Sequence, residues 1–306
     1  MPVLAESSGA ESRVFQKDLA PYAPEFGKRL TDVLAKAPLW GILSGPSGWT
    51  PEFRTATEKA DRVSRREQVC AHGIDTHLLQ VTRNAFVLAD AIAPSSERET
   101  TVLNDTNLTF LSLTHDLGYA DPSISWDDKK APGHIDASIV WLDRTRQKTR
   151  SPFNPSANRS LNVLDENIEM YSSVMRGMSE DSLKKEQTSP RKRQPTPVDL
   201  LTQAVTFADK ADFFRAGRLA GLDTPPSYDA NPYFFLADAV RDYSLDAGDG
   251  KLTYSVELQR GWTFERWKKE VETQGYGWVL GTGRQFARSL GLEFEVQEMP
   301  LAASLR

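Results

Sequence analysis

Apolar residues recur at steps of three and four between positions 74 and 92 of this chain. The run consists of Ile74, Leu78, Val81, Ala85, Leu88, Ala89 and Ile92. This spacing predicts a helix with one face packed into a core. His77 falls on that apolar face, so the pattern predicts an imidazole that points inward.

Similar spacing predicts a largely helical chain. Further helices are expected over residues 26–39, 55–69, 108–118, 134–144, 162–178 and 198–219. Near the C-terminus, residues 231–243 are expected to be helical and aromatic. Residues 252–258 and 292–296 alternate like strands, with helical segments 263–275 and 279–290 between them. The sequence therefore predicts a mostly α protein with a small C-terminal α+β appendage.

Composition suggests three parts. We expect an N-terminal helical extension over residues 1–55, a helical core over 56–225 and the appendage over 226–306. A polar segment at about 179–197 holds Lys184-Lys185 and Arg191-Lys192-Arg193 among Ser, Thr, Gln and Pro. We interpret it as a flexible, solvated insertion in the core. The alternative interpretation is a clamp on phosphate or nucleic acid.

The overall composition excludes several classes of protein. The chain has 306 residues and a net charge of −5, which is no whole-chain signature of nucleic-acid or polybasic membrane binding. A single cysteine, Cys70, cannot form an internal disulfide or a cysteine-rich zinc site. No targeting signal is visible, and no stretch approaches the ~18 apolar residues that a membrane span needs. We expect a cytoplasmic enzyme without membrane association.

Histidine is scarce and concentrated. The four histidines are His72, His77, His115 and His134, and none occurs in the 172 residues that follow. A Ser-His-Asp hydrolase or a metalloenzyme must therefore draw its imidazoles from this short window. His72 lies beside Gly73, off the main apolar face, and is interpreted as a turn or surface residue.

His115 and Asp116 are adjacent in an apolar, helical stretch. Burying an imidazole and a carboxylate together is costly unless something compensates. A divalent cation would compensate, because neutral imidazoles and carboxylates are its usual ligands. His77 can supply a third ligand from the preceding helix. Asp209 or Asp212 can supply a fourth from a later helix that is rich in small and apolar residues.

Four ordered stretches resemble the HD-domain metal-dependent phosphohydrolase superfamily. They are His77-Leu-Leu-Gln-Val81, Leu113-Thr-His-Asp-Leu-Gly-Tyr119, Gly133-His-Ile-Asp-Ala-Ser138 and Phe207-Ala-Asp-Lys-Ala-Asp212. The resemblance covers roughly residues 60 to 220 and implies an HD-domain helical bundle. It implies that the metal ligands are His77, His115, Asp116 and Asp209, the last because Ala-Asp-Lys is the usual ligand position. Asp212 would then orient a ligand or bind substrate.

The resemblance also implies a chemistry. One divalent ion (Mn, Mg, Co, Ni, Zn or Fe) would activate water for hydrolysis of a small, nucleotide-like phosphate ester or anhydride. Asp116 would accept the proton of the water, and His134 would protonate or hold the leaving group. Lys129, Lys130, Lys210 and Arg215 are candidates for binding the phosphate of the substrate. A second metal is not expected, because residues 162–178 offer no further histidine.

Three other functions stay open at this point. An HD-type iron oxygenase would need two irons and more histidines than the chain supplies. A non-catalytic HD regulatory or binding module would keep the fold and lose the chemistry. A single-strand nuclease is supported by the basic run 184–193 alone, so a nucleic-acid partner is not expected. The aromatic residues Trp262, Phe264, Trp267 and Trp278 suit a core or a dimer face, which leaves homo-oligomerisation open.

Overall fold

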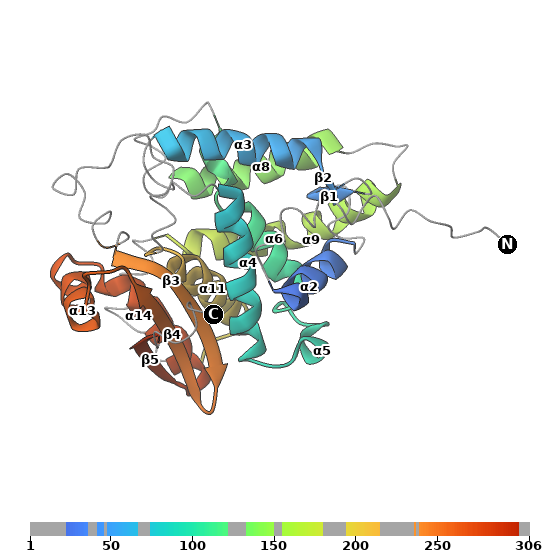
Figure 1. The fold of residues 1–306 in the computed structure, drawn as a ribbon. Helices are drawn as coiled ribbons and strands as arrows, with labels where there is room; N and C mark the ends of the chain where they lie inside the picture. The colour runs from blue at the N-terminus through green and yellow to red at the C-terminus, as the bar shows by residue number, and fades with distance from the viewer. Residues whose placement is uncertain are drawn as a thin grey trace.

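The computed structural model describes residues 23–35, 42–45, 48–66, 74–121, 133–149, 155–179, 194–214, 236 and 239–299. Its N-terminal and central part is helical (Figure 1). The elements there are α2 (Pro24–Leu34), the short strands β1 (Ser44–Gly45) and β2 (Gly48–Trp49), α3 (Pro51–Arg66), α4 (Ile74–Asp90), α5 (Ser95–Arg98), α6 (Asp105–Thr114), η1 (Leu117–Ala120), α8 (His134–Thr149), α9 (Pro155–Gly177) and α11 (Pro197–Ala211).

Helix α4 is the central element of this part. It packs against α3, α6 and α11, and also against strand β3 (Val240–Gly248) of the C-terminal sheet. Its apolar side chains are buried, with Val81, Leu88 and Ala89 at 0% exposure. His77 is equally inaccessible, so the prediction of an inward-pointing imidazole is confirmed.

The helix expected over 108–118 has different bounds. α6 ends at Thr114, His115 and Asp116 form a turn, and η1 begins at Leu117. Gly118 lies against the start of α8, where a Cβ atom would come within 1.8 Å of the His134 carbonyl oxygen. The amide of Gly118 donates to the Ser138 hydroxyl at 2.8 Å, and that hydroxyl donates to the His115 carbonyl at 2.5 Å. The glycine thus permits the backbone to meet α8 closely.

Two arginines join the ends of several helices. The Arg98 guanidinium is 1% exposed and donates to Asp90 at 2.6 Å and to Asp105 at 3.2 Å. Arg29, on α2, donates to the same two carboxylates at 2.6 and 2.7 Å. This cluster fixes α2 to the C-terminal end of α4 and to the first turn of α6.

Helix α11 begins at a capping box. The Thr196 hydroxyl accepts from the Asp199 amide at 3.2 Å, and the Asp199 carboxylate accepts from the Thr196 amide at 2.9 Å. These two bonds satisfy backbone donors that a helix start leaves unpaired. Proline at the first helical position suits the same start.

The C-terminal part is a small α+β unit made of β3 (Val240–Gly248), β4 (Lys251–Leu258), α13 (Phe264–Thr273), α14 (Gly277–Leu290) and β5 (Glu293–Glu298). β3 and β4 form an antiparallel hairpin, and β5 pairs parallel to β4 after the two helices. α14 packs on α11, which joins this unit to the helical part. The prediction of a mostly α fold with a small C-terminal α+β appendage is confirmed.

One expected element in this unit is wrong. Residues 231–243 were expected to be helical, but β3 begins at Val240. Asp249 and Gly250 form the two-residue turn after β3, with φ of 51° and 76°. An Asp-Gly pair with positive φ at both positions is the preferred connection of a tight hairpin, so the turn was visible in the sequence.

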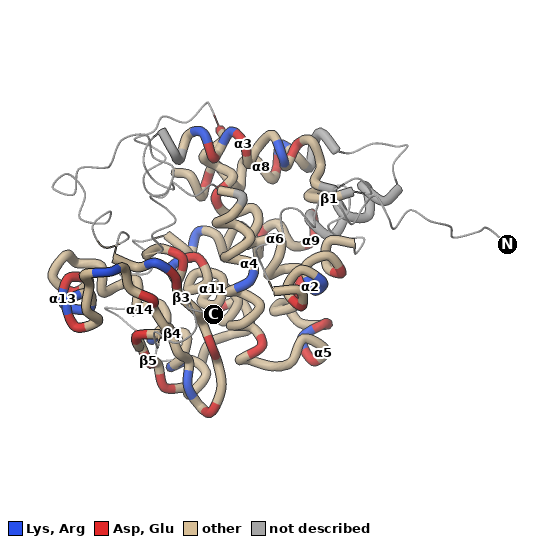
Figure 2. Tube along the Cα trace, in the orientation of Figure 1, with Lys and Arg blue, Asp and Glu red and all other residues tan. Residues whose placement is uncertain are grey.

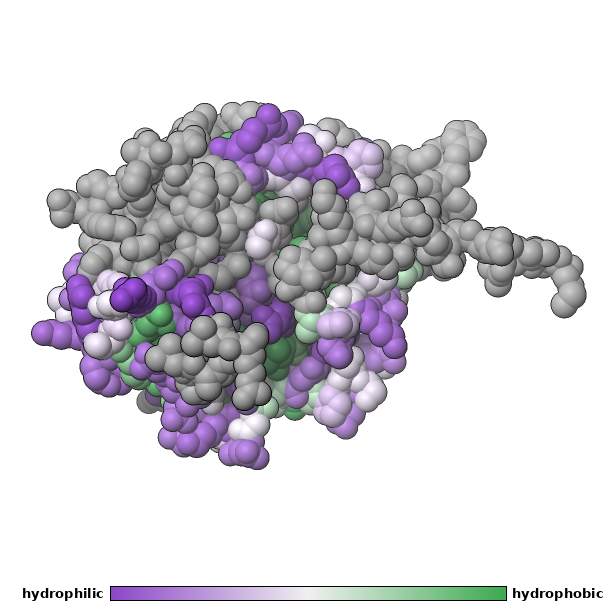
Figure 3. All heavy atoms as spheres, viewed as in Figure 1, coloured by the Kyte–Doolittle hydropathy of each residue, from purple (hydrophilic) through white to green (hydrophobic). Residues whose placement is uncertain are grey.

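Charged residues of both signs are interspersed over the described elements (Figure 2). The described surface facing the viewer in Figure 3 is largely hydrophilic. Among the described residues, Val140 is a large apolar residue with an exposed side chain, at 40%. None of the described helices is long and apolar enough to cross a bilayer.

Candidate metal centre

Four side chains from three elements converge beside the first turn of α4. His77 comes from α4, His115 and Asp116 from the turn after α6, and Asp209 from the last turn of α11. His77, His115 and Asp116 each offer an atom within 4.8 Å of the others. Oδ1 of Asp209 lies 3.3 Å from Nε2 of His77 and 3.8 Å from Nε2 of His115. The structure therefore brings together all four residues that the sequence predicted as ligands.

Hydrogen bonds on the far side of each ring fix which nitrogen is available. Nδ1 of His115 lies 2.9 Å from the Ser112 carbonyl oxygen, and Nδ1 of His77 lies 2.7 Å from Oδ2 of Asp212. A carbonyl and an ionised carboxylate can only accept, so both Nδ1 atoms carry the hydrogen. In a neutral ring the Nε2 atom then presents its lone pair. Nε2 of His115 is buried and has no hydrogen-bond partner in the described part of the chain.

The spacing of the four groups suits a shared cation. Nε2 of His77 and of His115 lie 3.5 and 3.6 Å from Oδ2 of Asp116. These separations, like the two to Asp209, exceed the roughly 2.7–3.2 Å of ordinary N–H···O bonds. Two ligand atoms that are each about 2.1 Å from one ion lie about 3.4 Å apart at a tetrahedral angle. Neutral imidazoles with lone pairs facing carboxylates at this spacing could hold a divalent ion.

Both carboxylates of the site are held in the ionised form. Burial works to raise the pKa of Asp116, but the imidazoles of His115, His134 and His77 outweigh it and the pKa is lowered. Burial likewise opposes ionisation of Asp209, but the Lys210 ammonium and the neighbouring imidazoles hold its pKa well below the ordinary value. The imidazoles lower these pKa values as protonated cations, so a divalent ion that binds their neutral Nε2 atoms would supply positive charge in their place.

His134 opens α8 at the more exposed side of the site. Its Nε2 lies 3.6 Å from Oδ1 of Asp116, and its side chain is 19% exposed. The Tyr119 ring stacks on the imidazole, with centroids 4.7 Å apart and planes at 5°. Ser138, one turn further along α8, accepts the Gly118 amide and fixes α8 against the turn that carries Asp116.

Asp212 and Lys210 flank Asp209 in different ways. Asp212 is fully buried behind His77, so its geometry favours orienting that ligand over contacting a substrate. Lys210 donates from Nζ to Oδ2 of Asp209 at 2.6 Å, and its side chain is 20% exposed. The other predicted phosphate-binding residues, Lys129, Lys130 and Arg215, lie outside the described residues, as do Cys70, His72 and the basic run 184–193.

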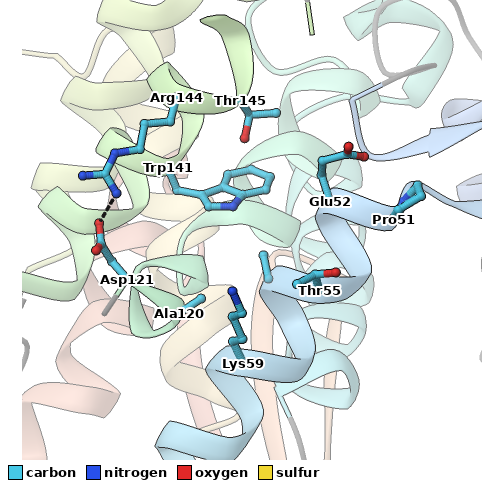
Figure 4. A pocket seen from close by; sticks show the side chains of 10 residues that line it. Pro51, Glu52, Thr55, Lys59, Ala120, Asp121, Trp141, Arg144 and Thr145 are labelled. Carbon is cyan, nitrogen blue, oxygen red and sulfur yellow. Dashed lines mark hydrogen bonds and ion pairs between the residues drawn. The ribbon is translucent and has the colours of Figure 1, made fainter. Parts of the chain in front are cut away.

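A cavity of about 390 Å³ lies among α3, η1 and α8, and none of its lining residues is a candidate metal ligand (Figure 4). Trp141 and Lys59 point toward each other from the two facing helices (Figure 4). Arg144, on α8, is paired with Asp121 at 2.9 Å. Trp141 follows His134 by seven residues, so the two share one face of α8, about 10 Å apart along the helix axis. The cavity size is within the range of small-molecule sites.

Comparison of the chain with protein-family models, with curated proteins and with solved structures found no match.

Proposed function

We propose that the protein is a metal-dependent phosphohydrolase of the HD type that acts on a small, nucleotide-like phosphate ester or anhydride. The observation that carries the proposal is the pair of buried imidazole Nε2 atoms of His77 and His115, which face the carboxylates of Asp116 and Asp209 at 3.3–3.8 Å. The order of these residues along the chain, and their resemblance to the HD superfamily, supports the same assignment.

The chemistry that a divalent ion supplies in such a site is neutralisation of phosphoryl charge and a lower pKa for an attacking water. In the proposed reaction Asp116 would accept the proton of an attacking water, and its Oδ1, which lies 3.6 Å from Nε2 of His134, connects it with the proposed acid. His134, stacked on Tyr119, is held where it can donate a proton to the leaving oxygen. Lys210 offsets negative charge beside Asp209.

The cavity beside α8 supports a substrate with a planar ring. An indole face offers stacking to such a ring, and the side chain of Lys59 offers a positive charge. Because Trp141 and His134 share one face of α8, a substrate long enough to span the two would have its phosphoryl group at the metal centre and its ring against Trp141. We therefore expect Trp141→Ala to raise KM for the substrate several-fold and to leave kcat nearly unchanged.

The test is phosphate release from a panel of nucleotides and p-nitrophenyl phosphate with Mn²⁺, Co²⁺, Ni²⁺ or Mg²⁺. We expect release that requires added metal and falls at least 100-fold in His115→Ala and Asp116→Ala. Thr109→Ala is the matched control, because Thr109 is buried on α6 but belongs to no part of the site. Release at wild-type levels by either site variant would refute the assignment.

The same assay separates the two alternative HD functions. Tight binding of one ion per chain without turnover of any phosphoester would favour a regulatory or binding module. Two irons per chain, with oxygen consumption, would favour the iron oxygenase.

A further inference from the structure

A chain of buried hydrogen bonds connects the C-terminal sheet to the candidate metal centre. Tyr243, on β3, donates from its hydroxyl to Oδ1 of Asp212 at 3.2 Å. Oδ2 of the same carboxylate lies 2.7 Å from Nδ1 of His77. Tyr243 is 2% exposed, and Asp212 and His77 are both at 0%. The path therefore runs from β3 through Asp212, the C-cap of α11, to the candidate ligand His77 on α4 without passing through solvent.

The direction of the bond from Tyr243 to Asp212 is set at the far end of this path. The Asn84 amide nitrogen donates to the Ala208 carbonyl at 2.9 Å and to the Tyr243 hydroxyl at 2.7 Å. A carbonyl oxygen cannot donate, so it fixes the orientation of the Asn84 amide. Because the tyrosine oxygen accepts from Asn84, its own hydrogen is left to be donated to Asp212.

The same reasoning extends to Nε2 of His77, the nitrogen that faces the candidate metal position. An ionised Asp212 accepts at both of its oxygens, so a neutral His77 then carries its hydrogen on Nδ1 and directs the Nε2 lone pair toward Asp116 and Asp209. A partner that fixes the tautomer and orientation of a ligand histidine contributes to metal affinity, and loss of such partners commonly weakens binding 10- to 100-fold.

We propose that Tyr243 is a positioning residue of the metal centre: by holding Asp212, it fixes the tautomer and orientation of His77, so that the C-terminal sheet sets the affinity of the site for its cation. The inference rests on the metal centre of the proposed function but not on hydrolysis of phosphate. It gives the C-terminal unit a role in the site, although none of the four predicted ligands belongs to that unit.

Tyr254 provides a matched control on the neighbouring strand. Its ring lies beside that of Tyr243, with centroids 5.5 Å apart, and it is 1% exposed. Its hydroxyl also donates to α11, but to the Ala211 carbonyl at 3.0 Å. Tyr243→Phe and Tyr254→Phe thus each remove one buried hydroxyl that donates to the C-terminal end of α11, and Tyr243→Phe also removes an acceptor of the Asn84 amide. Only the first removes a bond to Asp212.

The experiment is titration of the metal-free, full-length protein with Mn²⁺ by calorimetry, together with the visible absorption spectrum of the Co²⁺ form. We expect Tyr243→Phe to raise the Kd for Mn²⁺ by about 3- to 10-fold and to alter the Co²⁺ spectrum. Asp212→Asn should raise the Kd by about 10- to 100-fold. Tyr254→Phe should stay within twofold of wild type with an unchanged spectrum, although its Tm falls by about as much as that of Tyr243→Phe.

Equal effects of the two tyrosine variants on Mn²⁺ affinity, or wild-type affinity in Tyr243→Phe, would overturn the inference. Wild-type protein that binds no Mn²⁺ or Co²⁺ would overturn it together with the metal centre. Wild-type protein that binds Mn²⁺ but hydrolyses no phosphoester would refute the proposed function alone, because the titration still decides the role of Tyr243.

Discussion

Gly118→Ala tests how closely the turn after His115-Asp116 must approach α8. The new Cβ atom would lie 1.8 Å from the His134 carbonyl oxygen and 2.6 Å from the Ser138 amide nitrogen, both of them backbone atoms. Contacts below 3.0 Å are essentially never tolerated, so the turn and the start of α8 must separate by at least the difference, 1.2 Å. A backbone obstacle cannot rotate away as a side chain does.

The separation has two measurable costs. Overpacking costs about 1–3 kcal/mol, and the 2.8 Å bond from the Gly118 amide to Ser138 lengthens to about 4 Å, which loses about 1 kcal/mol more. We therefore expect urea unfolding of Gly118→Ala to show about 2–4 kcal/mol less stability than wild type. His134 also withdraws from Asp116, so kcat should fall while the affinity for Mn²⁺ changes less.

Two other glycines serve as controls. At Gly248 an added Cβ meets nothing within 4 Å, so Gly248→Ala should keep wild-type stability and activity. At Gly177 it meets the Thr202 methyl group at 2.6 Å, between α9 and α11, so Gly177→Ala should lose stability without losing kcat specifically. Gly118→Ala that unfolds at the same urea concentration as Gly248→Ala would refute the close-packing argument.

Three further outcomes are expected. Mn²⁺ at 100 times its Kd should stabilise the protein by about 2.7 kcal/mol in thermal or urea unfolding, and neither EDTA-treated protein nor His115→Ala should show this gain. Burial would raise the pKa of Asp105, but Arg29 and Arg98 lower it below 3.8; its ion pairs therefore stabilise the fold above the unfolded pKa and are lost as pH falls through the folded one. Asp105→Asn should lower the free energy of unfolding by up to about 3 kcal/mol at pH 7. A difference in the free energy of unfolding between variant and wild type that stayed constant below about pH 4 would contradict this. Lys210→Gln should lower the Kd for Mn²⁺ about fivefold, because a nearby positive charge is removed, and raise KM for the phosphorylated substrate; a weaker affinity for Mn²⁺ would count against the placement of Lys210 beside the ion.

Local patterns were enough to predict much of the fold. Helical spacing predicted α4 and placed His77 in the core, because a strongly periodic segment has one way to bury its apolar face. The same reasoning failed at Val240, where aromatic and apolar residues suit a strand as well as a helix. The hairpin there depends on the Asp249-Gly250 turn, which is a two-residue signal and not a periodic one.

Residues that act through distant partners were beyond local patterns. Arg98 is surrounded in the sequence by polar residues, which is typical of a surface turn. It is nevertheless buried, because Asp90 and Asp105 approach it from two other segments. The role of Asp212 depends on a bond to a residue 135 positions away. Tyr243 could not be connected with a metal site at all, because its contact with Asp212 exists only once the C-terminal sheet has packed on α11.

The capping box at Thr196 and Asp199 fixes the first residue of α11 through local contacts. The helix starts at a position encoded by residues 196–199, and Asp209 follows Thr196 by 13 residues, so the phase of this carboxylate is set from within its own helix. Insertions or deletions between Ser179 and Thr196 should therefore leave the phase of Asp209 on α11 unchanged. That makes the chain before the cap a suitable place to introduce an epitope or a fluorophore while the metal centre is being measured.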